Sequence, residues 1–478
     1  MGDKYMKKII SIILSTLFLI IIISNYNNVY AEDESLQDNK AIKNINNEEV
    51  ECVNTEETSD NISNEYIENE FIIKFKTDDI KALSEEDMES EVKDLVEEEY
   101  ITVTSNESIA ETLMGSSLQL VKYQGEEGVE EVIDSIYSNY GDLIEYIEPN
   151  YTITIEPTEE IVDSEESINE NNDVSGEWTS YDYYYNSLWG LKNKNFNNID
   201  INAENAWNIT RGNSNIVVAV IDSGVNINHS DLRNNIYKNQ RETLNGKDDD
   251  GNGYIDDING WDFFNNDNDP NDENGHGTHV AGIIAAEANT IGVIGVAPNI
   301  KIMPLRFLDR NARGSIENAI RAIDYAAKMN VPIVNNSWGG YSYSKSLYDA
   351  LKTSNALQVC SAGNEANNND MNPEYPSSYD LDNIISVASI DMAGGISNFS
   401  NYGKNSVDVG APGADILSTL LNNSYGYGSG TSMAAPYVAG IAALIKSKYT
   451  YYTPSEIKSI IMNNVDSLSS LQGRTVPG

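Results

Sequence analysis

Three separate segments of this chain carry side chains that could cooperate in acyl transfer. The apolar run 216–221 ends at Asp222, which is typical of a buried parallel strand that presents a carboxylate at its carboxyl end. His276 and Ser432 each begin a small-residue segment of helical character, the second running to about Lys448. An acid, an imidazole and an alcohol in this chain order could form a triad in which the imidazole takes the proton of the attacking hydroxyl.

Each of the three residues has a simpler interpretation when it is taken alone. Asp222 could be a turn former, and His276 and Ser432 could be helix caps. Glycines frame all three, which favours the joint interpretation; the segments are Asp222-Ser223-Gly224, Gly275-His276-Gly277 and Gly430-Thr431-Ser432. A hydroxyl at the start of a helix also lies near the positive end of the helix dipole, where developing negative charge is favoured.

With these motifs, residues 186–478 resemble the subtilisin-like serine proteases, the subtilase family. The resemblance implies that Asp222 orients and stabilises the imidazole, that His276 is the general base and then the acid, and that Ser432 is the nucleophile. It also implies that Asn364, in the segment 361–365, donates to the oxyanion together with the backbone N–H of Ser432. One such donor contributes about 3–4 kcal/mol of transition-state stabilisation. Taken alone, Asn364 could be a loop residue in a left-handed conformation.

The resemblance further implies a substrate cleft with two walls and a floor. The first wall, which also pairs with extended substrate, is Ser337, Trp338 and Gly339, and the second is Ser361, Ala362 and Gly363. The floor is expected at Glu374, just before Tyr375-Pro376, and Glu365 is expected at the rim. By the same resemblance, the Tyr375–Pro376 peptide bond should be cis.

Two carboxylates at this cleft would favour lysine or arginine at P1, the substrate residue before the cleaved bond, by charge pairing. The alternative is that both carboxylates face solvent and that P1 is a large apolar residue. The sequence also contains a conflict, because no lysine or arginine lies between Lys122 and Lys192. An enzyme that strictly required a basic P1 residue could not cleave itself in that stretch.

The acidic segment 248–257 indicates a second kind of chemistry. Its oxygen-bearing residues alternate, with glycine at the fourth and sixth positions and isoleucine at the eighth, a spacing typical of calcium loops. The candidate ligands are Asp248, Asp250, Asn252, Tyr254 and Asp256. Position twelve is Asn259, so the loop is not a full EF-hand, and a replacement for the usual glutamate would come from Asp257, Asp262 or Asp267. The alternative is a solvated acidic turn, although so many like charges repel one another without a cation.

The resemblance implies another calcium site, which combines a carboxylate nine residues after Asp222 with a loop that follows the His276 segment. The implied ligands are the side chains of Asp231 and Asn289 and the backbone carbonyls of Glu287, Ile291 and Val293. The N-terminal side-chain ligand that the family usually adds cannot be located in the sequence.

The formal net charge of −45 is unevenly distributed along the chain. Residues 32–180 carry 43 acidic and 7 basic side chains, and such acidity argues against nucleic-acid binding. Residues 1–31 are typical of a secretory signal peptide, because lysines precede a 15-residue apolar run that is short for a membrane span. We therefore expect a secreted protein with no stable membrane span; an uncleaved anchor at the cell surface is the alternative.

The region between the signal peptide and the expected catalytic domain divides into three parts. Residues 32–69 are acidic, rich in Asn and Glu, and expected to be disordered. Residues 70–156 show the order strand, helix, strand, strand, helix, strand of a small α+β domain, with strands near 70–76, 100–103 and 144–151 and helices near 85–98 and 128–140. By position it resembles the inhibitory propeptide of subtilases; an unrelated adaptor domain is the alternative. Residues 157–185 form an acidic linker in which the maturation cleavage is expected.

Residues 186–478 are expected to form an α/β catalytic domain with a doubly wound parallel sheet, because strands and helices alternate along them. The expected strands include 300–305, 331–335, 357–360 and 384–388, and the expected helices include 316–329 and one that runs from the Ser432 motif to about Lys448. Thr453-Pro454 is expected to cap and begin the last helix. The resemblance would place a few more residues after Gly478.

These patterns predict a secreted, calcium-stabilised serine endopeptidase that is made as a self-inhibited zymogen. We expect it to act as a monomer on protein or peptide substrates, with its own propeptide as intramolecular inhibitor. Within the same class, the alternative is a dedicated processing protease that matures one exported peptide, such as a leader peptidase. From another class, the alternative is a catalytically silent subtilase-like scaffold. Such a scaffold would be expected to lack one of the four proposed catalytic residues, and none is missing.

Overall fold

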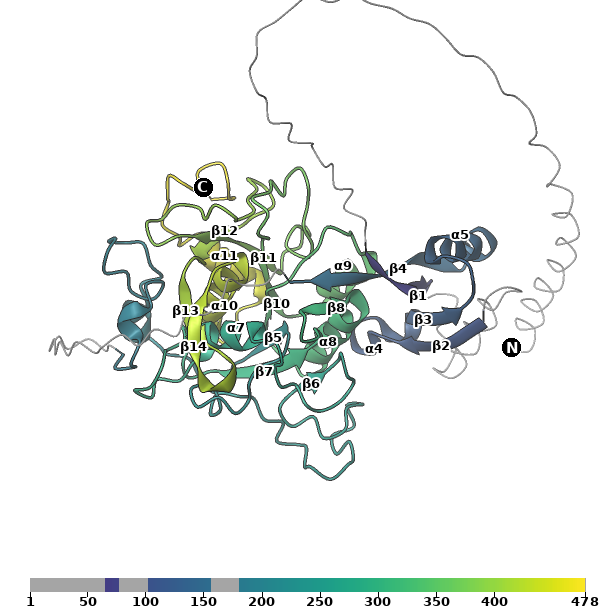
Figure 1. Cartoon of the computed structure of the whole chain (residues 1–478), viewed down its shortest axis with the longest axis horizontal. Helices are drawn as coiled ribbons and strands as arrows, with labels where there is room; N and C mark the ends of the chain where they lie inside the picture. Colours follow the sequence, from purple (N-terminus) through teal and green to yellow (C-terminus); the bar gives the residue numbers. More distant parts are fainter. Residues whose placement is uncertain (1–64, 77–101, 156–179, 478) are drawn as a thin grey trace, which may run out of the picture. The chain divides into compact units, whose positions relative to one another are not determined.

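The computed structural model describes residues 65–76, 102–155 and 180–477 (Figure 1). The predicted signal peptide, the predicted helix at 85–98 and most of the predicted linker lie outside the described residues.

The larger sheet has seven parallel strands in the order β12-β11-β10-β9-β5-β7-β6. They are β5 (Val217–Asp222), β6 (Trp261–Asp262), β7 (Lys301–Arg306), β9 (Ile333–Asn336), β10 (Leu357–Ser361), β11 (Ile384–Ile390) and β12 (Val409–Pro412). β5 lies between β7 and β9, so the strand order reverses there. Binding sites in such sheets form at the carboxyl ends beside a reversal, and Asp222 is the last residue of β5.

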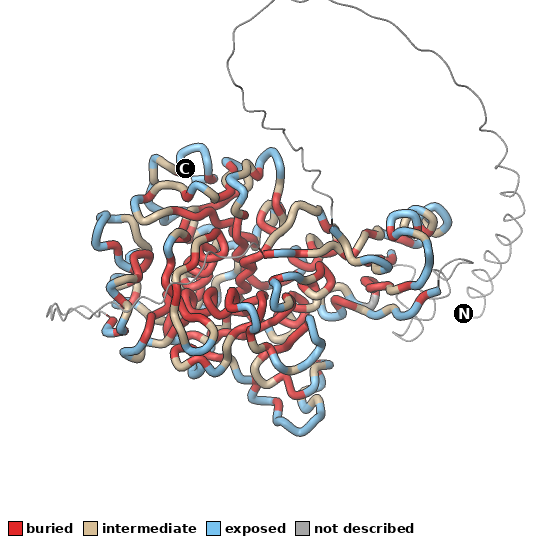
Figure 2. Tube along the Cα trace, viewed as in Figure 1, coloured by how far each residue is buried: buried red, intermediate tan, exposed pale blue. Residues whose placement is uncertain are grey.

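Helices cover both faces of this sheet. Because alternate residues of a strand point to opposite faces, Val218 and Val220 of β5 join one core with α7 (His276–Ala285), α10 (Thr431–Lys448) and α11 (Pro454–Met462). Ala219 and Ile221 join a second core with α8 (Ile316–Lys328) and α9 (Lys345–Thr353). Figure 2 shows the buried residues concentrated along these strands and helices. The predicted doubly wound α/β fold is confirmed.

Local sequence signals account for most of the element boundaries. The expected strands at 300–305, 357–360 and 384–388 and the expected helix at 316–329 match observed elements to within two residues. The helix expected to run from the Ser432 motif to about Lys448 ends at that residue. The strand expected from residue 331 begins at Ile333, after Pro332, which has no N–H to donate to a neighbouring strand. Thr453 caps α11 as predicted, because its Oγ1 accepts from Glu456 N (3.3 Å) and its backbone N donates to Glu456 Oε2 (2.8 Å).

A short hairpin lies against α7. It consists of β13 (Ile416–Thr419) and β14 (Tyr425–Gly428), joined by the 3-10 turn Leu421–Asn423. The hydroxyl of Ser418 donates to His279 O (2.7 Å), and the hydroxyl of Thr419 donates to Thr278 O (2.8 Å). The remaining short elements of this part are α6 (Ala203–Trp207) and the 3-10 turn Tyr185–Ser187.

A second, antiparallel sheet precedes this fold in the chain. Its strands are β1 (Tyr66–Phe75), β2 (Thr102–Ser108), β3 (Leu118–Gln124) and β4 (Ile144–Thr154), in the order β2-β3-β1-β4. α5 (Val129–Tyr140) covers one face through Phe71 and Ile73, whereas Ile72 belongs to the core formed with α8 and α9. The helix α4 (Glu111–Met114) and the 3-10 turn Gly115–Ser117 connect β2 to β3. The predicted helix at 128–140 and the predicted strand at 144–151 are confirmed.

The second sheet is extended by a strand from the larger fold. β8 (Arg313–Ser315) pairs antiparallel with the end of β4, with Thr152 opposite Ser315 and Thr154 opposite Arg313. The backbone N of Ile155 then donates to Ala312 O (3.0 Å). Residues 66–155 are therefore joined to residues 180–477 by main-chain hydrogen bonds as well as by the shared core.

Among the described helices, none combines the length and the apolar character needed to cross a bilayer. The Tyr375–Pro376 peptide bond is cis, as predicted.

Candidate active site

Asp222 and His276 meet at the carboxyl end of β5. Asp222 is fully buried, and one of its oxygens also accepts the backbone N–H of Ser223 (2.7 Å). His276 is the first residue of α7. The next residue, Gly277, lets this helix turn approach the strand end, because a Cβ at that position would collide with the carbonyl of Gly224.

The imidazole of His276 is held by both oxygens of the Asp222 carboxylate. Nδ1 lies 2.8 Å from Oδ1 and 3.0 Å from Oδ2. Burial lowers the pKa of His276, but the charge and hydrogen bonds of Asp222 outweigh burial, with a smaller effect of Asp272, and the pKa is raised. Nε2 is buried without a hydrogen-bond partner among the described residues. An Nδ1–H donated to Asp222 leaves the lone pair on Nε2, so this nitrogen can act as a base.

Ser432 lies in the first turn of α10, close to the first turn of α7. The two helices pack against each other. Gly428, at the end of β14, lies beside both helix starts. A Cβ built on it would lie 3.1 Å from Cε1 of His279 in α7 and 3.4 Å from Sδ of Met433 in α10. The hydroxyl of Ser432 donates to Ser337 O (3.1 Å), and no hydrogen bond joins it to His276 in the described structure. The sequence-predicted alcohol and imidazole thus come from adjoining helix termini but are not directly bonded.

Asn364 lies beside the start of α10. It follows β10 and Gly363, and its Oδ1 accepts the backbone N–H (2.8 Å) and the hydroxyl (3.0 Å) of Thr431. This orientation fixes the oxygen end of the amide against Thr431 and leaves the Nδ2 hydrogens as donors on the opposite side. A Cβ on Gly430 would lie 3.6 Å from Nδ2, so the amide runs alongside the segment that carries Ser432.

The two predicted walls of the cleft are held against this same helix start. Ser337, which follows β9, donates its hydroxyl to Ser432 O (2.8 Å), and the backbone N of Gly363 donates to Thr431 Oγ1 (3.0 Å). Trp338 is only 2% exposed and packs on Phe307 at a ring distance of 5.2 Å, so its backbone is the part that can face a substrate. Ser361 and Ala362 are buried as the chain leaves β10.

Glu374, predicted at the floor of the cleft, lies between the two walls. A Cβ on Gly339 would collide with Oε1 of its carboxylate, and a Cβ on Gly363 would collide with Oε2. Asn401 Nδ2 donates to Glu374 Oε2 (2.8 Å) and also to Glu365 Oε2 (2.9 Å). The two carboxyl groups therefore meet at one amide, an arrangement that the sequence did not reveal because Asn401 lies in a later loop.

The sequence model of the subtilase family matches residues 213–476, a range that contains Asp222, His276, Asn364 and Ser432. The chain belongs to the subtilase family.

Known relatives of this subtilase are proteases. It is 34% identical over 417 residues to the thermophilic serine proteinase of Bacillus sp. (strain AK1), and the match covers 86% of each chain. It is 37% identical over 273 residues to thermitase of Thermoactinomyces vulgaris, covering 56% of this chain and 87% of thermitase. Among solved structures, it is similar to fervidolysin from Fervidobacterium pennivorans, a keratinolytic enzyme related to subtilisin, with a TM-score of 0.64, 25% identity and coverage of 84% of this chain and 58% of that one. The subtilase is a serine endopeptidase.

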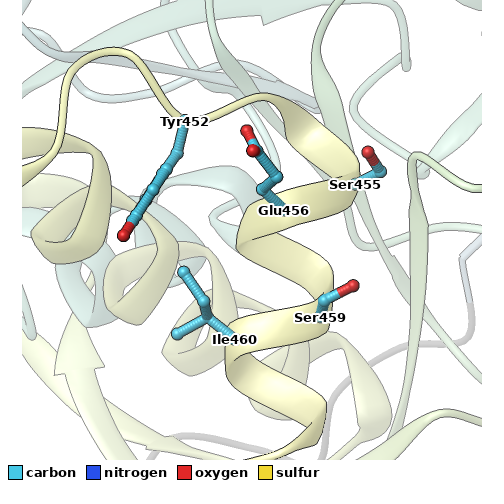
Figure 3. Close-up of a pocket in the computed structure, with 5 residues that line it drawn as sticks. All are labelled: Tyr452, Ser455, Glu456, Ser459 and Ile460. Carbon is cyan, nitrogen blue, oxygen red and sulfur yellow. The ribbon is translucent and has the colours of Figure 1, made fainter.

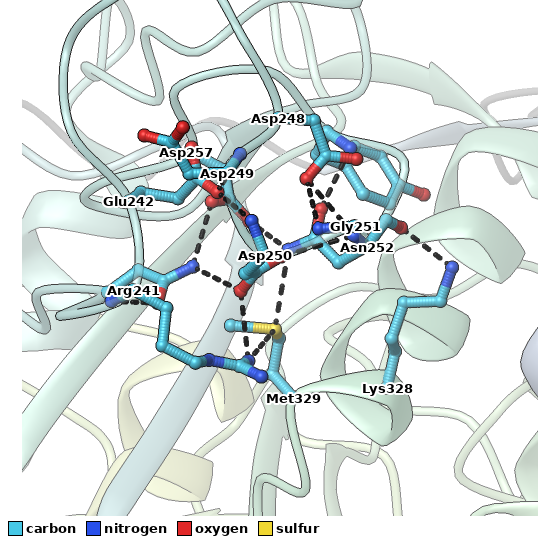
Figure 4. Close-up of polar contacts among 12 residues, drawn as sticks. Arg241, Glu242, Asp248, Asp249, Asp250, Gly251, Asn252, Asp257, Lys328 and Met329 are labelled. Atoms are coloured by element: carbon cyan, nitrogen blue, oxygen red, sulfur yellow. Dashed lines mark hydrogen bonds and ion pairs between the residues drawn. The ribbon is translucent and has the colours of Figure 1, made fainter.

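An acidic loop of the subtilase brings several carboxylates close together (Figure 4). Oxygens of Glu242, Asp248 and Asp250 all lie within 4.8 Å of one another. Asp248 accepts the backbone N–H groups of residues 251, 252 and 253, and Glu242 Oε1 accepts those of residues 249 and 250. Glu242 Oε2 is buried and has no hydrogen-bond partner among the described residues. The sequence pattern had predicted Asp248 and Asp250, but Glu242 comes from before the loop and no spacing signalled it.

The other predicted ligands of the acidic loop have different partners. Asn252 Oδ1 accepts the backbone N–H of Tyr254 (2.8 Å), and Asn252 Nδ2 donates to Asp257 Oδ2 (2.7 Å). The carboxylate of Asp256 accepts backbone N–H groups of residues 245 and 246. Arg241 forms an ion pair with Asp250 Oδ2 (3.0 Å). Among the described acidic side chains, the trio Glu242, Asp248 and Asp250 is therefore the part of the loop that could hold a cation.

The second predicted calcium region is also assembled around a buried acid. Asp231 accepts from Asn289 Nδ2 (2.8 Å) and from the backbone N of Val293 (2.9 Å). Burial raises the pKa of Asp231 to about 7, although both hydrogen bonds lower it, and Asp182 adds a repulsive charge. Asp182 accepts the backbone N–H groups of residues 289 and 290. These contacts bring an acidic side chain that precedes β5 in the sequence to the 287–293 loop, and no spacing in the sequence signalled it.

The side chain of Glu287 and the backbone N–H of Ile291 contact groups other than Asp231. The carboxylate of Glu287 accepts from the backbone N (2.9 Å) and Nδ2 (2.8 Å) of Asn234. The backbone N of Ile291 donates to Asn289 Oδ1 (3.0 Å). Both contacts fold the loop 287–293 over Asp231, and they leave the backbone carbonyls of Glu287, Ile291 and Val293 as the groups that the prediction assigned to the metal.

A surface pocket of about 340 Å3 lies on α11 (Figure 3). It is lined by Tyr452, Ser455, Glu456, Ser459 and Ile460. None of these residues belongs to the candidate active site or to the two acidic regions. Glu456 already takes part in the cap of α11, so this pocket adds nothing to the chemistry described above.

Proposed function

We propose that this subtilase is a secreted endopeptidase that hydrolyses peptide bonds through the triad Asp222, His276 and Ser432. One observation is the main support: Asp222 holds Nδ1 of His276 with both oxygens, while Nε2 is buried and has no hydrogen-bond partner among the described residues. A fixed imidazole with an unused basic nitrogen beside a helix-terminal serine suits general-base catalysis. The raised pKa of His276, in which Asp222 outweighs burial, supports its role as a proton acceptor.

In the proposed reaction, Ser432 first turns its hydroxyl from the Ser337 carbonyl towards His276 Nε2. The proton moves to Nε2 as Oγ bonds to the substrate carbonyl carbon, and Asp222 stabilises the imidazolium. Asn364 Nδ2 and the backbone N–H of Ser432 bind the resulting oxyanion. Nε2 then returns the proton to the departing amine as the C–N bond breaks, and water hydrolyses the acyl-enzyme by the same steps.

A serine-directed fluorophosphonate tests the triad directly. The active protein is expected to be labelled once per chain, and Ser432→Ala is expected to remain unlabelled. Labelling of Ser432→Ala at an equal rate would refute the assignment of the nucleophile.

We further propose that residues 66–155 act as an intramolecular inhibitor that makes the chain a zymogen. The support is the way β4 binds the larger fold. Glu148 accepts from Ser344 Oγ (2.8 Å), Lys345 N (2.8 Å) and Ser346 N (3.0 Å) at the start of α9. Asn150 Oδ1 accepts from Glu317 N (3.2 Å) at the start of α8. Side-chain acceptors at two helix N-termini favour docking of β4 there.

The maturation bond is proposed to lie within residues 156–179. The support is the burial of the chain that follows, since Ser180, Asp182 and Tyr185 are each less than 10% exposed. A cut after Tyr185 would remove residues that belong to the core of the larger fold. Sequencing the N-terminus of the mature protein tests both this bond and the proposed secretion after removal of residues 1–31.

Calcium is proposed as a structural ion at two places. At the acidic loop, Glu242, Asp248 and Asp250 would supply hard oxygen ligands, and the unpartnered Glu242 Oε2 supports this assignment. At the second region, Asp231, Asp182 and Asn289 would do so, together with the backbone carbonyls of the 287–293 loop. In both places the cation would offset the repulsion between buried or crowded carboxylates.

A further inference from the structure

Glu374 is a buried acid whose carboxyl group receives too few hydrogen bonds for a purely structural role. It is 6% exposed, and among the described residues the side chains that act on its carboxyl are Glu365 and Asn401. Glu148, which is also buried, instead accepts hydrogen bonds from four groups on three residues of the α9 terminus. A buried carboxyl with one amide donor and another carboxyl as neighbours is costly unless a proton or a cation joins it.

Glu374 lies between two cleft walls that are hydrogen-bonded to the start of α10, the helix that carries the proposed nucleophile Ser432. Its two oxygens lie against Gly339 and Gly363, one on each wall. Each wall is bonded to the α10 start, through Ser337 Oγ to Ser432 O (2.8 Å) and through Gly363 N to Thr431 Oγ1 (3.0 Å). By the resemblance to subtilases, a peptide whose carbonyl reaches Ser432 is expected to place the side chain before that bond between these walls, where Glu374 lies.

In the described structure, no positively charged side chain pairs with the carboxyl groups of Glu374 and Glu365. Burial raises the pKa of Glu374 well above its ordinary range, and Glu365 raises it further by charge and by hydrogen bonding, against the lowering effect of Asn401. Within the described residues, Tyr341 is a further titratable group that faces the pair, and its pKa is raised by burial and then by Glu365 and Glu374. No lysine or arginine in the described part of the chain forms an ion pair with either carboxylate.

We propose that Glu374 and Glu365, bridged by Asn401, form a cation-binding floor that selects lysine or arginine at P1. This inference rests on the proposed triad, because P1 is defined by the bond that Ser432 attacks. The absence of side chains at Gly339 and Gly363 brings both walls onto the carboxylate, so an ammonium or guanidinium group reaching the floor would be enclosed on both sides. An apolar P1 group would leave the buried carboxyl of Glu374 unpaired, and such mispairing gives strong discrimination.

A basic P1 preference also affects how the chain can be matured. No lysine or arginine lies between Lys122 and Lys192, and Lys192 follows residues that are already part of the core. A pocket that selects a basic P1 residue disfavours self-cleavage in the 156–179 segment. Cleavage there by another protease is therefore the expected route of maturation.

The decisive experiment compares two substrates of the mature enzyme that are identical except at P1. One carries lysine and the other norleucine, which has the same chain length without the ammonium group. We expect kcat/KM to favour lysine at least ~10-fold at pH 8, and we expect Glu374→Gln to reduce that ratio at least ~10-fold. Asp382→Asn, which removes an equal charge from an exposed site, is the control and should leave the ratio unchanged.

The pH dependence of the same ratio gives an independent readout. Since the pKa of Glu374 is raised by burial and then by Glu365, its charged form is gained as pH rises. The lysine preference should therefore increase from pH 5 to pH 8 in the wild type and be flatter in Glu374→Gln.

Equal or better cleavage after norleucine, or a preference for alanine because Glu374 fills the pocket, would overturn the proposal while leaving the protease assignment intact. If the wild type neither cleaves any P1 substrate nor reacts with fluorophosphonate, the proposed triad itself is wrong and the specificity inference falls with it.

Discussion

The carboxylate of Asp222 contacts Nδ1 of His276 through both of its oxygens, at 2.8 and 3.0 Å. This contact fixes the ring and its tautomer, because an acceptor-only carboxylate requires the proton on Nδ1. The basic lone pair then lies on Nε2, the nitrogen that has no other partner in the described structure. The orientation of the His276 imidazole is therefore set by Asp222 at the end of β5 and not by contacts within α7.

Replacing Asp222 by asparagine should lower kcat about 10^4-fold while the fold is kept. The amide can donate to Nδ1, which would place the proton on Nε2 and remove the base. Steady-state kinetics measure the effect, and thermal unfolding of the variant checks that it remains folded. A loss of less than tenfold would contradict the proposed role of Asp222.

Replacing Asn364 should separate its two roles. Asn364→Ala is expected to lower kcat by about 10^2–10^3-fold with little change in KM, because the oxyanion loses a donor. Asn364→Asp keeps an oxygen for Thr431 N and Thr431 Oγ1 but has no Nδ2 hydrogens. We expect Asn364→Asp to be as impaired as Asn364→Ala. Recovery of activity in Asn364→Asp would mean that the residue only holds the α10 start.

The acid limb of kcat/KM should reflect His276. Burial lowers the pKa of this imidazole, but Asp222 outweighs that effect, so the pKa is raised above 6.5. The neutral ring is the active form, which means that activity is present above this pKa and is lost as pH falls through it. We expect the midpoint of the loss above pH 6.5. His279 cannot produce this limb, because burial lowers its pKa to about 4.

Calcium should stabilise the protein through the acidic loop. A free Ca2+ concentration a hundredfold above the dissociation constant adds about 2.7 kcal/mol to the free energy of unfolding per site. Thermal unfolding with Ca2+ and with a chelator measures this difference. Glu242→Gln and Asp248→Asn should reduce it, whereas Asp382→Asn should not. An unchanged calcium response in both loop variants would rule out the Glu242, Asp248 and Asp250 trio as a site.

Glu148→Gln should weaken the hold of residues 66–155 on the larger fold. The charged acceptor for Lys345 N and Ser346 N is lost, and we expect a loss of about 3 kcal/mol in binding free energy. Inhibition can be followed after cleavage at a protease site introduced within residues 156–179. Glu145→Gln, on the same strand but exposed, is the matched control. Equal inhibition by the Glu148→Gln and Glu145→Gln proteins would show that Glu148 does not contribute to docking.

Local patterns predicted much of this molecule because their physical cause is local. The apolar run before Asp222 specified a buried strand, and Thr453-Pro454 specified the cap of α11 through contacts within one helix turn. The spacing of Asp248 and Asp250 likewise depends on a single tight loop. The motif around Ser432 predicted a helix start, and α10 begins at Thr431.

Groups supplied from a distance could not be predicted in this way. Glu242 and Asp182 reach their acidic regions from outside the loops, and Asn401 bridges Glu365 and Glu374 from a later segment. The pairing of β8 with β4 is also a long-range register that no local pattern encodes. In each case the partners become neighbours only after the chain has folded.

If residues 66–155 are released as proposed, the loss of the β4–β8 pairing exposes a strand of the larger fold. β8 would then become a bare strand edge, the kind of surface on which chains aggregate. It offers only the three residues Arg313–Ser315, and Arg313 is an exposed cation. The mature molecule would thus lose a companion strand without gaining a template long enough for self-association.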